Sequence, residues 1–104
     1  MIEYFPVAAV ESLAPGKART VYARGREFAL FNLDGQFYAT EDRCPHRGAS
    51  IGAGWLENDT ISCPMHGWLF DPRTGSCLSN PDRPLKSFPV RIRDGEVELG
   101  LDTP

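Results

Sequence analysis

The sequence predicts an all-β fold, an antiparallel β-sandwich or small barrel, and three observations favour it. Short runs of β-branched and aromatic residues recur along the 104-residue chain and are separated by turn signals. Asp-Gly pairs at 34–35 and 94–95 lie between such runs, which indicates tight hairpins. Only residues 8–14 favour a helical turn, and Pro15 ends it.

Three strands are expected in the first half of the chain. The runs "ARTVYA", "EFALFNL" and "QFYAT" occupy residues 18–23, 27–33 and 36–40. The Asp34-Gly35 pair joins the last two runs as a hairpin, so these strands pair in antiparallel fashion.

Two more strands are expected near the C-terminus, over residues 85–92 and 96–101, and Asp94-Gly95 joins them. Within "VRIRDGEVEL" the apolar residues alternate with charged ones. This period of two is typical of a half-buried antiparallel pair. Opposite charges on the outer face can then pair across the two strands.

The stretch between these two groups of strands, residues 43–84, has a different composition. It is rich in Cys, His, Gly, Pro and Trp, with brief strand signals only at 60–62 and 68–71. A region so poor in aliphatic residues cannot be held together by a hydrophobic core alone, and a bound metal centre can supply the missing stability. We therefore expect one domain, residues 1–104, with this stretch inserted as a loop-rich, metal-binding subdomain.

Charge and composition bear on the class of partner and on the compartment. The formal net charge of −3 and a pI of about 5.3 argue against nucleic acid or an anionic membrane as the main partner. The start of the sequence lacks the basic residues and apolar run of a signal peptide, and no stretch reaches transmembrane length. We expect a cytoplasmic protein in a reducing compartment, where its three cysteines need an explanation other than disulfides.

Both histidines and two of the three cysteines occur in two short stretches, "RCPHRG" and "SCPMHGW". The pattern is Cys44-x-His46, sixteen residues, then Cys63-x-x-His66. Thiolates suit iron–sulfur clusters, zinc and copper(I), and imidazole suits zinc, copper and iron. These four residues are therefore the candidate metal ligands.

Neighbouring residues shape the two stretches. A proline follows each cysteine and fixes the backbone beside the thiolate. Gly48 and Gly67 follow the histidines and permit a positive φ.

Two alternatives to an iron–sulfur site are open. The first is that these are unrelated buried cysteines and surface histidines, which the presence of two matched stretches disfavours. The second, a structural zinc site, commonly pairs Cys with Cys and His with His, whereas each stretch here mixes the two types.

The pattern C-x-H-x16-C-x-x-H, with "CPHRG" and "CPMHGW", resembles the signature of Rieske [2Fe–2S] proteins. "GWLFDPRTGSCL" and "PLKSFPVRIRDGEVEL" extend the resemblance to small bacterial Rieske ferredoxins, over about residues 21–101. The resemblance implies one [2Fe–2S] cluster per chain. Cys44 and Cys63 would bind one iron through sulfur, and His46 and His66 would bind the other through a ring nitrogen.

The resemblance also bears on the reduction potential. Respiratory Rieske domains carry an extra cysteine in each loop, forming a disulfide, and a serine that donates a hydrogen bond to the cluster. Here these positions hold Ala49, Met65 and Trp68. Fewer hydrogen bonds to the cluster sulfurs stabilise its reduced form less, so we expect a potential of about −150 mV.

No histidine remains for the 2-His-1-carboxylate iron site of an oxygenase. The resemblance therefore implies an electron carrier that is not catalytic alone, and a monomer is the default expectation for a small carrier. A flavoprotein NAD(P)H reductase would reduce it and a terminal Rieske oxygenase would oxidise it. A small subunit of a cytoplasmic NADH-dependent nitrite reductase is the alternative, with that enzyme's large subunit as partner. A zinc-stabilised binding module is the third hypothesis.

Four other features carry expectations. Cys77 has no histidine at ligand spacing, so we expect a buried or partly buried free thiol. Trp55 is expected in the core of the inserted stretch, while Trp68 either belongs to that core or faces a partner. "SNPDRP", residues 79–84, resembles the third, proline-containing loop that shields the cluster in this family, or is an ordinary surface turn.

Overall fold

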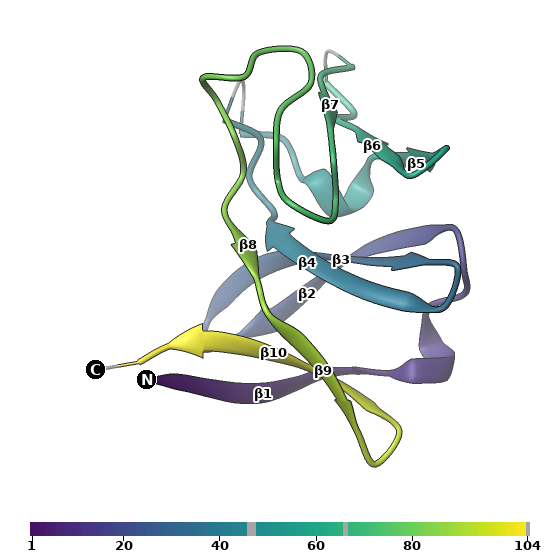
Figure 1. Ribbon diagram of the computed structural model, residues 1–104, viewed down its shortest axis with the longest axis vertical. Helices are drawn as coiled ribbons and strands as arrows, with labels where there is room; N and C mark the ends of the chain where they lie inside the picture. The colour runs from purple at the N-terminus through teal and green to yellow at the C-terminus, as the bar shows by residue number, and fades with distance from the viewer. Residues whose placement is uncertain (46–47, 66, 104) are drawn as a thin grey trace.

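The computed structural model describes residues 1–45, 48–65 and 67–103, and this part of the chain is almost entirely β (Figure 1). All strand pairings in it are antiparallel, which confirms the predicted fold class. The elements are β1 (Ile2–Ala9), η1 (Val10–Ser12), β2 (Lys17–Ala23), β3 (Arg26–Leu33), β4 (Gln36–Glu41), η2 (Ile51–Ala53), β5 (Trp55–Glu57), β6 (Thr60–Ser62), β7 (Leu69–Phe70), β8 (Ser87–Phe88), β9 (Val90–Arg93) and β10 (Glu96–Asp102), where η marks a short 3-10 helix.

The strands form three sheets, in the orders β1-β10-β9, β2-β3-β4-β8 and β5-β6-β7. Figure 1 shows them stacked, with the first sheet at the bottom, the four-stranded sheet above it and the small sheet at the top. The chain's two ends lie together in the bottom sheet. There the N-terminal ammonium donates to Asp102 Oδ1 at 2.9 Å and lowers the pKa of that carboxyl.

Strand β3 is covered on both faces. Its successive side chains point to opposite sides of the sheet. Phe28 and Leu30 belong to the lower core, which includes Val97 and Leu99. Ala29 and Phe31 belong to an upper core formed with the inserted stretch. Burial on both faces explains why "FALF" is an unbroken apolar run. The four-stranded sheet is therefore the platform against which the described part of residues 43–84 packs.

Most predicted strands are confirmed to within one residue, namely those at 18–23, 27–33, 36–40, 60–62 and 96–101. The predicted hairpins are also present. Asp34 and Gly35 have φ of 54° and 93°, and Asp94 and Gly95 have φ of 52° and 78°, as tight two-residue hairpins require. The run at 68–71 shortens to β7. The run at 85–92 divides at Pro89 into β8 and β9, since proline has no N–H to donate.

Two strands were not predicted, β1 and β5. Strand β1 contains Pro6, and its register shifts between Pro6 and Ala8, so its sequence lacks a regular strand pattern. Proline is tolerated there because β1 is an edge strand. The helical turn predicted at 8–14 shrinks to the 3-10 turn of η1.

The alternation in the C-terminal hairpin is confirmed on its charged face, where Arg91 Nε lies 2.6 Å from Glu98 Oε1 on the opposite strand. The apolar face is less buried than the alternation predicts, because Ile92 is 52% exposed. Strand β9 is an edge strand, and Figure 1 shows its hairpin projecting beyond the sheet.

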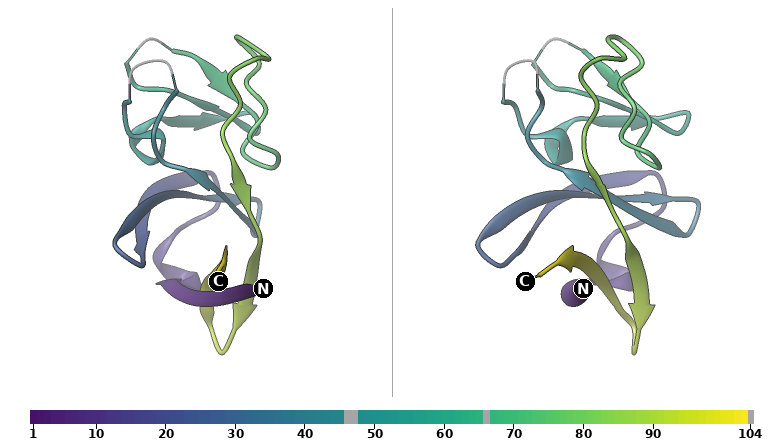
Figure 2. Two further views of the ribbon diagram at one scale, coloured as in Figure 1. Left: turned by 90° about the vertical axis from the view of Figure 1, so that its left-hand side faces the viewer. Right: turned by 60° about the vertical axis from the view of Figure 1, so that its left-hand side comes forward.

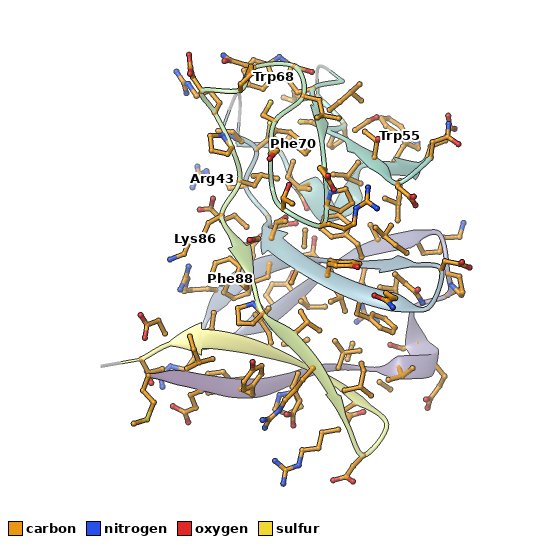
Figure 3. The ribbon with its side chains drawn as sticks, in the orientation of Figure 1. Arg43, Trp55, Trp68, Phe70, Lys86 and Phe88 are labelled. Atoms are coloured by element: carbon orange, nitrogen blue, oxygen red, sulfur yellow. The ribbon has the colours of Figure 1, made fainter. Side chains whose placement is uncertain are left out.

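The inserted stretch is held to the platform where it leaves and where it returns. At the return, the N–H of Lys86 donates to Glu41 Oε1 at 2.7 Å, and the N–H of Glu41 donates to the Lys86 carbonyl at 2.9 Å. Figure 3 shows Arg43, Lys86 and Phe88 along this edge. Where the stretch leaves, the N–H of Ile51 in η2 donates to the Asp42 carbonyl at 2.6 Å. There η2 packs on β2 so closely that a Cβ added to Gly52 would lie 2.6 Å from the Thr20 nitrogen. No helix among the described residues is long and apolar enough to cross a membrane.

Candidate metal centre

The first cysteine loop follows β4 and closes on itself through main-chain hydrogen bonds. The N–H of Cys44 donates to the Ala49 carbonyl at 2.8 Å, and the N–H of Gly48 donates to the Cys44 carbonyl at 2.7 Å. Gly48 has a φ of 74°, in the left-handed region that favours glycine. A Cβ there would also lie 3.2 Å from Arg43 Nε. The turn around the cysteine therefore depends on this glycine.

The second cysteine loop, between β6 and β7, repeats the first. The N–H of Cys63 donates to the Trp68 carbonyl at 2.8 Å, and the N–H of Gly67 donates to the Cys63 carbonyl at 3.0 Å. Gly67 has a φ of 71°. The signal in the sequence for this equivalence is Cys-Pro-x-x-Gly, which occurs in both loops. The ligand spacing alone does not show it, because the histidines occupy different places in the two loops.

The structure brings the two predicted cysteine ligands into one environment. Cys44 and Cys63 are 1% and 0% exposed, and both belong to the upper core with Phe31 and Phe70. Figure 3 shows Phe70 inside the upper part of the molecule. The other two predicted ligands, His46 and His66, lie outside the described residues.

These residues fit a Rieske-type [2Fe–2S] cluster. Two soft sulfur donors are held by two turns of the same geometry, and each turn also carries one histidine in sequence. The apolar surroundings of Cys44 and Cys63 limit the access of water, which is one way a protein sets the potential of such a centre. Elsewhere in the described part of the chain, no group of three His, Cys, Asp or Glu side chains could hold a metal ion.

The predicted third loop starts beside β7. The N–H of Leu78 donates to the Leu69 carbonyl at 2.7 Å, and the N–H of Leu69 donates to Ser79 Oγ at 3.0 Å. Both views in Figure 2 place the third loop at the same end of the molecule as the two cysteine loops. Cys77 is 3% exposed and its Sγ accepts the N–H of Asn80 at 3.3 Å, which confirms a buried thiol.

The two tryptophans occupy different environments. Trp55 was predicted in the core, and this is wrong, because 64% of it is exposed. Trp55 pairs with Ser62 across the small sheet, whereas Leu56 pairs with the buried Ile61, so Trp55 lies on the opposite, outer face. Trp68 is half-buried against the upper core, and Figure 3 shows it at the top of the molecule.

Two of the positions on which the predicted reduction potential depends, Ala49 and Met65, lie among the described residues. Ala49 is half-buried against the upper core, and Met65 is 58% exposed. Since neither side chain has a thiol, the two loops cannot be joined by a disulfide at these positions. The low potential remains a prediction of the sequence.

Comparison with known proteins extends these observations. The Rieske [2Fe–2S] domain family matches residues 3–89. The 3-phenylpropionate/cinnamic acid dioxygenase ferredoxin subunit of Photorhabdus laumondii subsp. laumondii is 46% identical over 95 residues, which cover 89% of this chain and 90% of that protein.

Two solved structures show the same fold. One is a chain in the complex of reduced oxygenase and oxidised ferredoxin in carbazole 1,9a-dioxygenase. It has a TM-score of 0.84 and is 40% identical, and the alignment covers 92% of this chain and 91% of that chain. Another, assigned to the small subunit of an NADH-dependent nitrite reductase of Mycobacterium tuberculosis, has a TM-score of 0.92 at 24% identity and covers 100% and 99%. The second likeness is one of fold alone. This chain belongs to the Rieske [2Fe–2S] domain family.

Proposed function

We propose that this chain is a one-electron carrier that holds one Rieske [2Fe–2S] cluster and passes electrons to a terminal oxygenase. The observation that carries the proposal is the pair of matched loops, each with a buried cysteine and a nearby histidine. When bound, the cluster supplies a one-electron couple. The chain supplies the ligands, an apolar shell and a surface on which a partner docks.

In this proposal Cys44 and Cys63 bind one iron through sulfur, and His46 and His66 bind the other through a ring nitrogen. Burial of both cysteines supports the sulfur side. Among the described residues next to the two histidine segments in sequence, 48, 65 and 67 are exposed and Pro45 is half-buried, so a partner can approach these residues. A short path through this exposed end suits electron transfer between docked proteins.

The proposed acceptor rests on the relatives. The matching ferredoxin subunit belongs to a 3-phenylpropionate/cinnamic acid dioxygenase, and another relative is seen in complex with the oxygenase of carbazole 1,9a-dioxygenase. We therefore take a terminal oxygenase as the acceptor. The donor is a flavoprotein NAD(P)H reductase. We propose a monomeric carrier in the cytoplasm.

A nitrite reductase small subunit is the second candidate, because "CPHRG" and "CPMHGWLFD" also resemble such subunits. The structural likeness to one of them is a likeness of fold alone. The ferredoxin subunits are the better match in sequence, which favours the carrier. The two differ in one property, because a carrier exchanges partners whereas a subunit stays bound to one.

The test is a single-turnover transfer. The reduced protein is mixed anaerobically with the oxidised oxygenase component of a 3-phenylpropionate dioxygenase, and its absorbance is followed in a stopped-flow instrument. The proposal predicts complete reoxidation, with one electron delivered per chain and no stable complex on gel filtration. Cys63→Ala is the control that cannot hold the cluster. A chain that reduces no oxygenase and elutes only in a fixed complex with a nitrite reductase large subunit would contradict the proposal.

A further inference from the structure

The third loop, residues 79–84, is built around a rigid turn. The N–H of Arg83 donates to the Asn80 carbonyl at 3.0 Å, and the N–H of Asp82 donates to Asn80 Oδ1 at 3.1 Å. Pro81 follows the asparagine, and its fixed φ suits the second position of such a turn. The turn therefore has one favoured shape, which sets the direction in which Arg83 leaves it.

Both ends of this loop are anchored. At its start, the N–H of Asn80 donates to the Sγ of the buried Cys77. At its end, the N–H of Leu85 donates to the Gly75 carbonyl at 2.7 Å, and Leu85 is 3% exposed. Gly75 and Leu85 approach so closely that a Cβ on Gly75 would overlap the Leu85 carbonyl oxygen. The loop cannot slide along the molecule without breaking one of these contacts.

From this position Arg83 reaches the first cysteine loop. Its Nη1 donates to the Pro45 carbonyl at 3.4 Å, a contact between residues 38 positions apart. Pro45 lies between the proposed ligands Cys44 and His46. None of the ion pairs formed among the described residues includes Arg83. The guanidinium therefore brings a positive charge to the segment that carries two of the four ligands.

We infer that Arg83 is a positioning residue that fastens the third loop to the first cysteine loop and, through its charge, makes the cluster easier to reduce. This inference rests on the proposed function. Reduction adds one negative charge to the cluster, so a fixed positive charge nearby stabilises the reduced form more than the oxidised form. Arginine keeps its charge throughout the physiological pH range, so the contribution is constant there.

The experiment compares two substitutions at this position with a matched control. Arg83→Gln removes the charge and retains a hydrogen-bond donor. Arg83→Lys retains the charge and loses the planar guanidinium group with its several N–H donors. The control is Arg73→Gln. Arg73 is an exposed arginine of the same inserted stretch, and its Nε lies 3.3 Å from Asp71. It belongs to the turn after β7, which Figure 1 shows reaching down towards the four-stranded sheet, away from the third loop.

The first readout is the reduction potential, measured by titration at low and at high ionic strength. We expect a more negative potential in Arg83→Gln, a smaller shift in Arg83→Lys and no shift in Arg73→Gln. The shift in Arg83→Gln should shrink as salt is added, because salt screens charges near the surface. The second readout is hydrogen exchange in peptides covering the third loop. We expect faster exchange in Arg83→Gln, including in protein without its cluster.

An unchanged potential in Arg83→Gln would overturn the inference, and so would equal shifts in the Gln and Lys variants, since charge would not then be the cause. If Arg83→Gln fails to hold its cluster, Arg83→Lys and the salt dependence of the wild-type potential decide the question. A wild-type chain that shows no Rieske signal after reconstitution would overturn the proposed function itself, a result distinct from a normal cluster that is indifferent to Arg83.

Discussion

The carboxylate of Asp42 accepts a hydrogen bond from the main-chain N–H of Gly52 at 2.8 Å, so the residue that follows β4 is tied to the helix η2. The same carboxylate accepts the hydroxyl of Ser50 at 2.8 Å and that of Thr20 at 3.2 Å. Asp42 is 3% exposed. One buried side chain thus joins the platform, through Thr20, to the stretch that carries the cysteine loops.

Asp42→Ala should lower the free energy of unfolding by about 3 kcal/mol, because it leaves buried donors without an acceptor. Urea denaturation followed by circular dichroism measures this. Glu3→Ala, which removes an exposed carboxylate from β1, is the control and should change stability by less than about 0.5 kcal/mol. Equal effects of the two substitutions would show that the Asp42 contacts contribute little.

Gly75→Ala and Gly95→Ala form a second matched pair. The two glycines have similar φ, 84° and 78°, so each alanine has the same backbone strain of about 1 kcal/mol. A Cβ at residue 95 meets open space, whereas one at residue 75 overlaps the Leu85 carbonyl. We expect Gly75→Ala to cost about 2 kcal/mol more in thermal or urea unfolding. Indistinguishable stabilities would mean that the third loop's base is not packed as described.

Alanine substitution of the three buried cysteines distinguishes the two proposed ligands from a thiol with a structural role. Cys44→Ala and Cys63→Ala should abolish the bound iron and sulfide, because each removes a proposed ligand. Cys77→Ala should retain both, since Cys77 accepts a hydrogen bond from Asn80 and lies outside the ligand pattern. Iron and acid-labile sulfide analysis after anaerobic reconstitution measures this. Retention of the cluster by Cys44→Ala would remove that residue from the ligand set.

Loss of the cluster should loosen one part of the molecule. We propose that residues 43–84 form the cluster-binding subdomain of a single domain, residues 1–104. The sheet of this stretch has strands of only two or three residues, and its core includes Cys44 and Cys63. Hydrogen exchange should therefore accelerate there on removal of iron, while β3 and β10 stay protected. Equal protection of the whole chain with and without iron would contradict this.

The sequence predicted the parts of the structure that depend on local chemistry. Asp-Gly pairs in tight hairpins adopt positive φ, so both hairpins could be placed, and the two cysteine loops could be located from the Cys-Pro pairs at their starts. Trp55 was misplaced because a three-residue strand is too short to show which face its side chains occupy. The contacts of Asp42 and Arg83 could not be predicted either. The contact of Asp42 with Thr20 and that of Arg83 with Pro45 join residues 22 and 38 positions apart, and only the folded chain brings such residues together.

The central claim is that the two cysteine loops hold a low-potential Rieske centre, and a potentiometric titration of the purified protein tests it most directly. Absorbance and low-temperature EPR follow the titration. We predict a one-electron wave at about −150 mV, with an anisotropic EPR signal of low average g. A wave well above zero would contradict the role given to Ala49, Met65 and Trp68. A colourless, EPR-silent protein that holds zinc after reconstitution with iron and sulfide would contradict the electron-carrier account as a whole.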